Sequence, residues 1–281
     1  MSGAGASGGH QASLLDISPP SPEQTRVPPH RPKPALSVVI PIFNEEANLP
    51  ELSRRLNVSV RGMGVSYEII FVDDGSTDHT TELLERLVAT DAAVRLIQFS
   101  RNFGQSMAVT AGLDVARGDL VALMDGDLQD PPEDVPKLVA KVKEGYDVVY
   151  AIRVKRKESL LRRMAIYVFY RVLNGMASTP LPVDSGLFSV MTRPVVDALK
   201  RLPERSRYVT GLRAWVGFKQ CGVPLERGAR RTGTSKSLAK LSRMAIDGMV
   251  SFSYVPLRLA TVVGVGTALL SIVGICWALY L

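Results

Sequence analysis

The stretch LVALMDGDLQDPP, at residues 120–132, is an apolar strand pattern that ends in a group of acidic residues. Acidic side chains at the end of a strand are not needed for packing, and neighbouring carboxylates repel one another. A divalent cation removes that repulsion, and Mg²⁺ usually takes one or two carboxylates together with substrate phosphates. The structural alternative is a polar turn closed by Pro131 and Pro132, and a second acidic strand end upstream favours the metal site.

Short apolar runs alternate with helical patterns on both sides of this stretch. Alternation of this kind predicts an α/β fold, in which helices cover both faces of a mostly parallel sheet. Helices are expected over residues 44–62, 79–91 and 106–117. The predicted strands cover residues 36–42, 67–72, 94–99, 120–124 and 147–151.

Three of the predicted strands end in polar clusters. Because ligands of such sheets bind beyond the carboxyl ends of the strands, these clusters are expected to converge on one crevice. Asp73 and Asp74 can accept hydrogen bonds from a nucleobase or a ribose, although helix capping would occupy one of them. Phe43 could lie against a base and Glu45 could bind a ribose hydroxyl, but a helix start explains both nearly as well. The clusters are Phe43-Asn44-Glu45, Asp73-Asp74 and Asp125-Gly126-Asp127.

The composition limits the classes of protein to which the chain can belong. Its 281 residues suffice for one large domain or two small ones, and its formal charge of +7 is compatible with anionic partners. The two cysteines and three histidines form no metal-ligand pattern in the sequence. A disulfide framework is not indicated either, which fits a reducing compartment.

The two ends of the chain differ in character. Residues 1–35 are rich in Gly, Ser, Pro and Ala, lack the pattern of a signal peptide, and are predicted to form a disordered tail. Residues 259–281 carry no charge and have the length of a bilayer crossing, so a transmembrane helix is predicted there in preference to a buried core helix. Arg243 and Arg258 precede it, and by the positive-inside bias its N-terminal side is expected in the cytoplasm.

Two basic groups lie between the sheet and the apolar end. They would meet an anionic ligand or anionic lipid, and solvated faces are the alternative. Residues 236–258 combine basic and apolar side chains at roughly helical spacing, which predicts interfacial amphipathic helices or, alternatively, a core helix. Nucleic-acid binding fits poorly with the apolar end. The first group is Arg153, Lys155, Arg156, Lys157, Arg162 and Arg163, and the second is Arg230, Arg231, Lys236, Lys240 and Arg243.

Taken together, residues 36–258 resemble the family-2 glycosyltransferases, whose fold is GT-A-like. Within that family they resemble the polyprenyl-phosphate branch, which includes bactoprenol glucosyltransferases and dolichol-phosphate mannose synthase. The narrower match is carried by Asp125-x-Asp127-x-Gln129-Asp130-Pro131-Pro132, Arg101-Asn102-Phe103-Gly104, Val183-Asp184-Ser185-Gly186, Arg230-x-x-Gly233-x-Ser235-Lys236 and Asp247-Gly248-x-x-Ser251-Phe252-Ser253.

The resemblance implies a site made of three sets of residues. The metal, Mg²⁺ or Mn²⁺, would be held by Asp125, Asp127 and Gln129. The catalytic set would be Asp127, Asp184 and Arg153, with Asp184 either acting as a base or orienting the sugar. Arginine suits phosphates because its planar fork binds two oxygens at once. The nucleotide sugar and its phosphates would be bound by Pro41, Phe43, Glu45, Asp73, Asp74, Arg230 and Lys236.

The chain also departs from the pattern of this branch. Thr234 stands where many relatives have Glu, and Leu187-Phe188 stands where many have Phe-Arg, which weakens any transfer of sugar identity. The Gln-x-x-Arg-Trp pattern of processive synthases is absent from the sequence, which favours a single transfer. The expected division is a tail at 1–35, a cytoplasmic glycosyltransferase domain at 36–235, juxtamembrane amphipathic helices at 236–258 and a transmembrane helix at 259–281.

The resemblance implies inverting transfer of a hexose from a nucleotide diphosphate sugar, with UDP-glucose as the guess, to polyprenyl (undecaprenyl) phosphate. The reaction is expected at the cytoplasmic face of the cell membrane, with membrane lipids as further partners and homo-oligomerisation left open. Two alternatives remain: a nucleotidyltransferase, which would release pyrophosphate, and a membrane scaffold with a degenerate enzyme domain. Intact Asp125, Asp127, Gln129 and Lys236 count against the scaffold.

Overall fold

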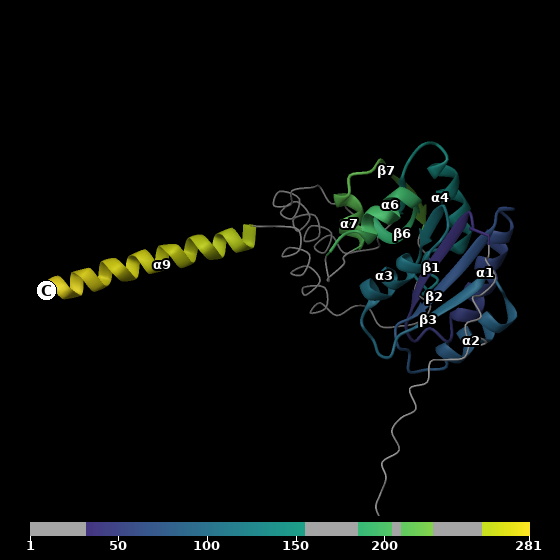
Figure 1. Cartoon of the computed structure of the whole chain (residues 1–281), viewed down its shortest axis with the longest axis horizontal. Coiled ribbons are helices and arrows are strands. Elements are labelled where there is room, and N and C mark those ends of the chain that lie inside the picture. Colours follow the sequence, from purple (N-terminus) through teal and green to yellow (C-terminus); the bar gives the residue numbers. More distant parts are fainter. Residues whose placement is uncertain (1–31, 155–184, 204–208, 227–254) are drawn as a thin grey trace, which may run out of the picture. The chain divides into compact units, whose positions relative to one another are not determined.

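The computed structural model describes residues 32–154, 185–203, 209–226 and 255–281. Its centre is a seven-stranded sheet with the strand order β3-β2-β1-β4-β6-β5-β7 (Figure 1). The strands are β1 (Leu36–Ile42), β2 (Tyr67–Asp73), β3 (Val94–Gln98), β4 (Leu120–Leu123), β5 (Val148–Val154), β6 (Ser185–Thr192) and β7 (Gln220–Glu226).

The sheet is mostly parallel, as the sequence predicted. β1 lies between β2 and β4 and is parallel to both, and β3 is parallel to β2. β6 is antiparallel to β4 on one side and to β5 on the other, while β7 is parallel to β5. Among the described strands, β6 therefore runs against all the others.

The sequence did not predict two of these strands, β6 and β7. β6 starts inside the Ser185-Gly186 motif, where Gly weakens the strand pattern. β7 forms an edge of the sheet and contains Gly222 and Pro224, and none of its residues is fully buried. Gly and Pro are both depleted in strands, so a short segment that contains both gives only a weak strand signal.

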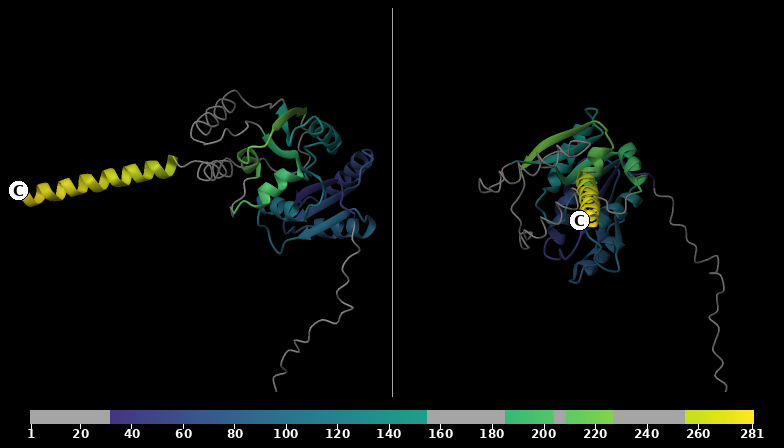
Figure 2. Two further views of the ribbon diagram at one scale, coloured as in Figure 1. Left: turned by 45° about the horizontal axis from the view of Figure 1, so that its top comes forward. Right: turned by 90° about the vertical axis from the view of Figure 1, so that its left-hand side faces the viewer.

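Helices cover both faces of the sheet (Figure 1, Figure 2). α1, α2 and α4 enclose an apolar core on one face, and α3, α6 and α7 enclose another on the opposite face. A short 3-10 turn, η2 (Pro132–Asp134), leads into α4. The helices of this domain are α1 (Leu49–Arg61), α2 (Thr80–Thr90), α3 (Gln105–Val115), α4 (Val135–Val142), α6 (Arg193–Lys200) and α7 (Val209–Trp215).

β1 is the centre of the domain, and all seven of its residues are buried. α3 can approach it closely because Gly112 has no side chain. A Cβ at that position would lie 2.2 Å from Cγ1 of Val39 and 3.2 Å from Cγ2 of Val72. Pairing of β1 with β4 ends at Val39 and Leu123, two residues before the buried Pro41, which has no N–H for a further ladder bond.

The observed helix starts show where the loops of the carboxyl edge lie. The helix predicted from Asn44 begins only at Leu49, because Asn44 takes a left-handed conformation (φ 53°) and the chain turns up to Asn48. The helix expected after Asp78 begins at Thr80, whose backbone N–H donates to the Asp78 carboxylate at 3.0 Å. Residues 43–48 and 74–79 are therefore loops rather than helix.

The amino end of the sheet holds a buried acidic residue. Glu68 in β2 accepts hydrogen bonds from the Ser37 hydroxyl at 2.7 Å and from the guanidinium groups of Arg95 and Arg117 at 3.1 Å. Burial opposes its ionisation, but the hydrogen bonds from Ser37, the Arg117 backbone N–H and Arg95 outweigh burial, so the pKa of Glu68 lies below its ordinary value. The cluster ties β1, β2 and β3 together at the end of the sheet opposite the acidic loops.

α9 (Val255–Tyr280) is the C-terminal helix. Its residues Ala260–Tyr280 are long and apolar enough to cross a membrane, and none of the segment is buried in the structure. Within the described ranges it is the one helix with these properties, and it overlaps the transmembrane segment predicted at 259–281. Most of the predicted tail and most of the juxtamembrane segment lie outside the described residues.

Candidate active site

Three polar strand ends meet at the carboxyl edge of the sheet. Because β2, β1 and β4 are neighbours and parallel, the loops that follow them leave the sheet side by side. The backbone N–H of Asp74 donates to the carbonyl of Ile42 at 2.8 Å, and that of Met124 donates to the carbonyl of Val39 at 3.2 Å. The three loops are thereby fixed relative to one another, as the strand pattern predicted.

Asp73, the last residue of β2, is completely buried and bonded to its own loop. Its carboxylate accepts the backbone N–H of Ser76 at 2.9 Å and the hydroxyl of Thr81 at 2.5 Å. These bonds hold the loop after β2 against the first turn of α2. Asp73 therefore supports the local structure, and its direct contact with a nucleoside stays a prediction.

Asp74 is 3% exposed and holds a different loop. Its Oδ1 accepts the backbone N–H of Phe103 at 2.7 Å, and its Oδ2 accepts that of Gly104 at 2.9 Å. Such charge-assisted bonds are stronger than those between neutral groups. Gly75 lets the loop come this close, because a Cβ there would lie 2.4 Å from the carbonyl carbon of Arg101. Contact of Asp74 with a nucleoside likewise stays a prediction.

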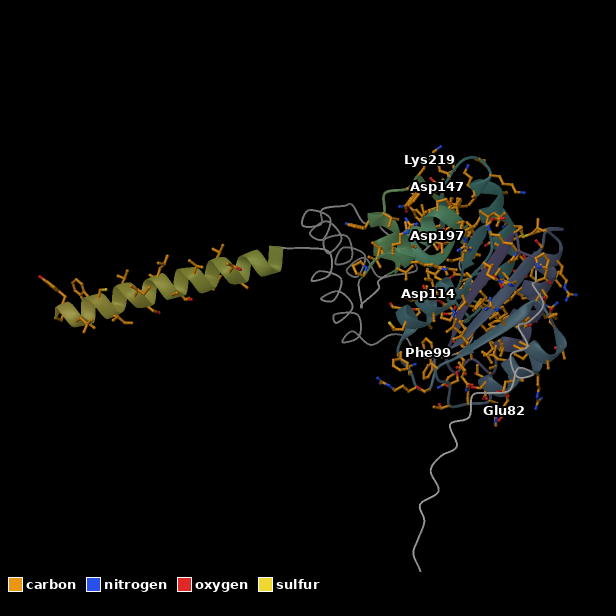
Figure 3. All side chains as sticks on the ribbon, viewed as in Figure 1. Glu82, Phe99, Asp114, Asp147, Asp197 and Lys219 are labelled. Carbon is orange, nitrogen blue, oxygen red and sulfur yellow. The ribbon has the colours of Figure 1, made fainter. Side chains whose placement is uncertain are left out.

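The loop held by Asp74 presents an exposed aromatic ring. Phe103 packs edge-on against Phe99, with ring centroids 5.5 Å apart and an interplanar angle of 87°. Phe99 directly follows β3 (Figure 3). The guanidinium of Arg101 lies 4.4 Å above the Phe103 ring. Phe103 is still 47% exposed and Phe43 is 42% exposed, so both could stack against a planar group.

The turn after β1 interlocks with the loop after β2. The side-chain carbonyl of Asn44 accepts the backbone N–H of Thr77 at 2.8 Å, and the backbone N–H of Asn44 donates to the Ser76 hydroxyl at 3.0 Å. These bonds offset the cost of the left-handed backbone at Asn44. The Glu45 carboxylate accepts the side-chain N–H of Asn48 at 2.6 Å, so it supports the start of α1.

The predicted metal ligands lie in a short loop after β4. Asp125 and Gln129 are half-buried, and Asp127 is 9% exposed. Asp127 accepts the backbone N–H of Gln129 at 3.1 Å, which folds the loop onto itself. Leu128 adopts a φ of 57°, an uncommon conformation for a residue other than glycine. Backbone strain of this kind is often found at functional sites.

The donor atoms of this loop fit a hard divalent cation. Asp125, Asp127 and Gln129 can offer two carboxylates and one amide oxygen, all of the type that Mg²⁺ and Mn²⁺ accept. Among the described residues, no group of three or more His, Cys, Asp or Glu side chains is placed to hold a metal. Two carboxylates are what Mg²⁺ commonly takes from a protein when phosphates and water complete its shell.

Sequence reasoning missed one residue at this edge. Gln105, the first residue of α3, donates a hydrogen bond from its side-chain amide to Oδ1 of Asp125. The available signal was its place directly after the Arg101–Gly104 motif, at the start of a helix. The two residues are 20 positions apart, however, and no sequence spacing relates them.

The antiparallel direction of β6 brings a further segment to the same edge. β6 begins at Ser185, beside the carboxyl end of β5, where Ser185 pairs with Ile152. Arg153 is the next residue of β5, and its backbone pairs with Leu225 of β7. The side chain of Arg153 and the predicted site residues Asp184, Arg230 and Lys236 lie outside the described part of the chain.

Comparison with known proteins identifies the family. Residues 37–200, more than half of the chain, match the family described as Glycosyl transferase family 2. The chain belongs to glycosyl transferase family 2, so the family predicted from its motifs is confirmed. It is therefore a glycosyltransferase, and the acidic edge of its sheet is the candidate active site.

Curated relatives narrow the comparison. The uncharacterized glycosyltransferase YkcC of Bacillus subtilis is 43% identical over 231 residues, covering 82% of this chain and 72% of the relative. The undecaprenyl-phosphate 4-deoxy-4-formamido-L-arabinose transferase of Pseudomonas paraeruginosa is 37% identical over 248 residues, covering 88% and 72%. The bactoprenol glucosyl transferase of Shigella phage SfV is 37% identical over 244 residues, covering 86% and 80%. These relatives confirm the resemblance to the polyprenyl-phosphate branch.

A solved structure supports the fold. The glucosyl-3-phosphoglycerate synthase of Mycobacterium tuberculosis, in complex with Mn²⁺, UDP and glucosyl-3-phosphoglycerate, is similar with a TM-score of 0.55 and 25% sequence identity. The similarity covers 78% of this chain and 79% of that protein. The predicted GT-A-like α/β fold is confirmed.

Proposed function

We propose that the protein transfers a hexose from a nucleotide diphosphate sugar to a polyprenyl phosphate, with inversion at the anomeric carbon. The observation that carries this proposal is the meeting of the β1, β2 and β4 carboxyl ends in a chain of glycosyl transferase family 2. Relatives named for undecaprenyl phosphate and for bactoprenol support the choice of acceptor.

The nucleotide would bind at the ends of β1 and β2. Phe43 and Phe103 offer exposed rings for the base, and Glu45 is near enough to the surface to meet a ribose hydroxyl. Asp73 and Asp74 would support this surface mainly through the loops that they hold, with Pro41 buried beneath. UDP in the solved relative and glucose in the name of the phage enzyme support UDP-glucose as the donor.

Asp125, Asp127 and Gln129 would hold a divalent cation. When bound, Mg²⁺ or Mn²⁺ would supply positive charge to the diphosphate that leaves the sugar. The Mn²⁺ ion of the solved relative supports this assignment. The chain's own contribution is to keep two carboxylates in one short loop, with its backbone shaped by Leu128 and its start held against β1.

The acceptor would need little activation by the protein. A phosphate monoester is already anionic near neutral pH, because its second pKa is about 6. It can attack the anomeric carbon without losing a proton to a side chain, so a general base matters less than it does for a hydroxyl acceptor. Asp184 would act as such a base or orient the sugar. Arg153, Arg230 and Lys236 would gather the phosphates of the reacting pair.

α9 would anchor this chemistry to a membrane. Its apolar segment has the length of a bilayer crossing. Arg243 and Arg258 precede the crossing, which favours a cytoplasmic catalytic domain by the positive-inside bias. An anchored domain would meet a lipid-linked acceptor at the membrane surface, where that acceptor is confined.

The direct test incubates the purified full-length chain with a panel of nucleotide sugars, undecaprenyl phosphate and Mg²⁺ or Mn²⁺. Mass spectrometry identifies the lipid product and the released nucleotide. A hexosyl phospholipid and a nucleoside diphosphate are expected. Released pyrophosphate would instead establish a nucleotidyltransferase, and failure to bind any nucleotide sugar by calorimetry would favour the scaffold.

The acceptor side has its own test. Arg153→Ala is expected to lower turnover with polyprenyl phosphate by about ten- to 150-fold, which corresponds to about 1.5–3 kcal/mol for one charge-assisted hydrogen bond. Nucleotide affinity should change much less. Arg153→Lys should also be impaired, because lysine lacks the two-point fork. Steady-state rates against acceptor concentration, beside calorimetry with nucleotide, decide the point. If turnover and nucleotide affinity fall by the same factor, Arg153 binds the donor diphosphate instead.

A further inference from the structure

The hydrogen bond from Gln105 to Asp125 joins two parts of the site that the sequence motifs keep separate. We infer that Gln105 is a positioning residue for the Asp125 carboxylate, and that Asp74 sets the place from which Gln105 reaches it. The inference rests on the proposed function, in which Asp125 holds a divalent cation. The contacts run from Asp74 through the backbone of Phe103 and Gly104 to Gln105, and from there to Asp125.

α3 is attached to the sheet at two points along its length. Near the middle, the bare backbone at Gly112 lies against Val39 of β1 and Val72 of β2. At the start, Asp74 accepts the N–H groups of the two residues that precede the helix. A helix held at both points cannot slide along β1 without breaking one contact, so Gln105 has a defined place at the carboxyl edge.

The loop before α3 is also held from the side. The Phe103 ring contacts the Phe99 ring edge-to-face and also contacts the guanidinium of Arg101. The backbone of Arg101 lies where a side chain at Gly75 would otherwise be. Because this loop is held against the end of β2, the position of that strand end determines where Gln105 lies. The Gln105 side chain in turn reaches Asp125, which follows β4, on the far side of β1.

The amide of Gln105 suits this task. Bonding to one oxygen of Asp125 restricts rotation of the carboxylate and partly offsets its repulsion from Asp127. A neutral donor does so without the positive charge that would compete with a cation. Outer hydrogen-bond partners of metal-ligating carboxylates typically alter metal affinity or activity by about 10–100-fold. Gln105 is exposed, so its removal leaves the apolar core intact.

The test measures Mn²⁺ binding to the purified full-length chain by electron paramagnetic resonance, with and without UDP. Gln105→Ala is expected to raise the Mn²⁺ dissociation constant by about 10–100-fold. Its unfolding temperature should be unchanged, and its turnover at saturating Mn²⁺ should recover much of the wild-type rate. Ser106→Ala is the matched control, because Ser106 is an exposed neighbour on the same turn of α3, and its Mn²⁺ affinity should stay at the wild-type value.

The link to Asp74 is tested by a double-mutant cycle. Asp74→Asn should also weaken Mn²⁺ binding. Because both substitutions disturb the same chain of contacts, the double variant should bind Mn²⁺ no more weakly than the single variant with the lower Mn²⁺ affinity. Additive losses would overturn the link between Asp74 and Gln105. Unchanged Mn²⁺ affinity in Gln105→Ala would overturn the positioning role. A wild-type protein that binds no Mn²⁺, with or without UDP, would overturn the proposed metal site itself and this inference with it.

Discussion

The carboxylates after β2 and those after β4 lie at the same edge of one sheet, yet the structure uses them differently. Asp73 and Asp74 are 0% and 3% exposed, and they accept hydrogen bonds from backbone N–H groups of two loops and from the hydroxyl of Thr81 in α2. Asp125 is half-buried, in a loop where Leu128 has a left-handed backbone conformation. Its carboxylate accepts a hydrogen bond from the side-chain amide of Gln105 in α3. Asp73 and Asp74 therefore support the loops, while Asp125 lies in the loop that we propose holds the cation.

The difference arises from what flanks each strand end. β2 has parallel neighbours on both sides, so loops leave β1 and β3 beside it and their N–H groups need acceptors. β4 has a parallel neighbour on one side and the antiparallel β6 on the other. The carboxyl end of β4 therefore lies beside the start of β6 on one side, rather than beside a loop that leaves a parallel strand. The acidic residues after these two strands therefore have different hydrogen-bond partners.

The largest effect is expected from Asp127→Asn, on the β4 side. The change keeps the size of the side chain and an acceptor for the Gln129 N–H, so the unfolding temperature should be unchanged. It removes a negative ligand of the cation, and loss of several kcal/mol of charge stabilisation lowers turnover by about a thousand-fold or more. Assays at saturating Mn²⁺ check this result. Near-wild-type turnover would show that Asp127 is not a metal ligand, and the proposed difference between the β2 and β4 carboxylates would be wrong.

Asp73→Asn, on the β2 side, should show the reverse pattern. Its bonds to Ser76 and Thr81 lose their charge, which should lower the free energy of unfolding by about 1.5–3 kcal/mol. The unfolding temperature would then fall by about 3–12 °C. The folded variant should keep far more activity than Asp127→Asn. If Asp73→Asn instead unfolds at the wild-type temperature and loses as much activity as Asp127→Asn, Asp73 takes part directly in substrate binding or catalysis.

Glu68 extends the contrast to the opposite end of the sheet. Its folded pKa is lowered, so its ionised form stabilises the fold above the unfolded pKa of about 4.3, and this stability is lost as the pH falls through the folded value. Glu68→Gln should cost about 1–2 kcal/mol at neutral pH and make acid unfolding less steep. The turnover of the folded variant should not change. Unfolding curves from pH 7 downward test this, and identical acid sensitivity in both proteins would contradict it.

The smallest effect is expected from deleting residues 1–30. Nothing in that segment resembles the site, and the deletion keeps Lys33, whose ammonium pairs with Asp119. Turnover should stay within about three-fold of the full chain, a change below about 1 kcal/mol. The measurement is the same lipid-product assay at equal protein concentration. A larger loss without aggregation would show that the tail takes part in substrate binding or regulation.

The sequence by itself determined the features that depend on local pattern. Apolar runs located β1 to β5 to within a few residues, because buried parallel strands are nearly continuous in Val, Ile and Leu. The polar motifs after three of these strands indicated the edge that carries the candidate site, and they identified the family to which the chain belongs. A charge-free segment located α9 because its composition is unusual for a soluble helix.

Only the tertiary structure decided how those motifs are used. The direction of β6 depends on pairing with β4 and β5, which its own Gly-containing sequence does not encode. The late start of α1 depends on bonds between Asn44 and the loop after β2, which overrode the local helix signal. The contact between Gln105 and Asp125 exists because α3 packs across β1 at Gly112. Such contacts join residues that are distant along the chain, so no local pattern records them.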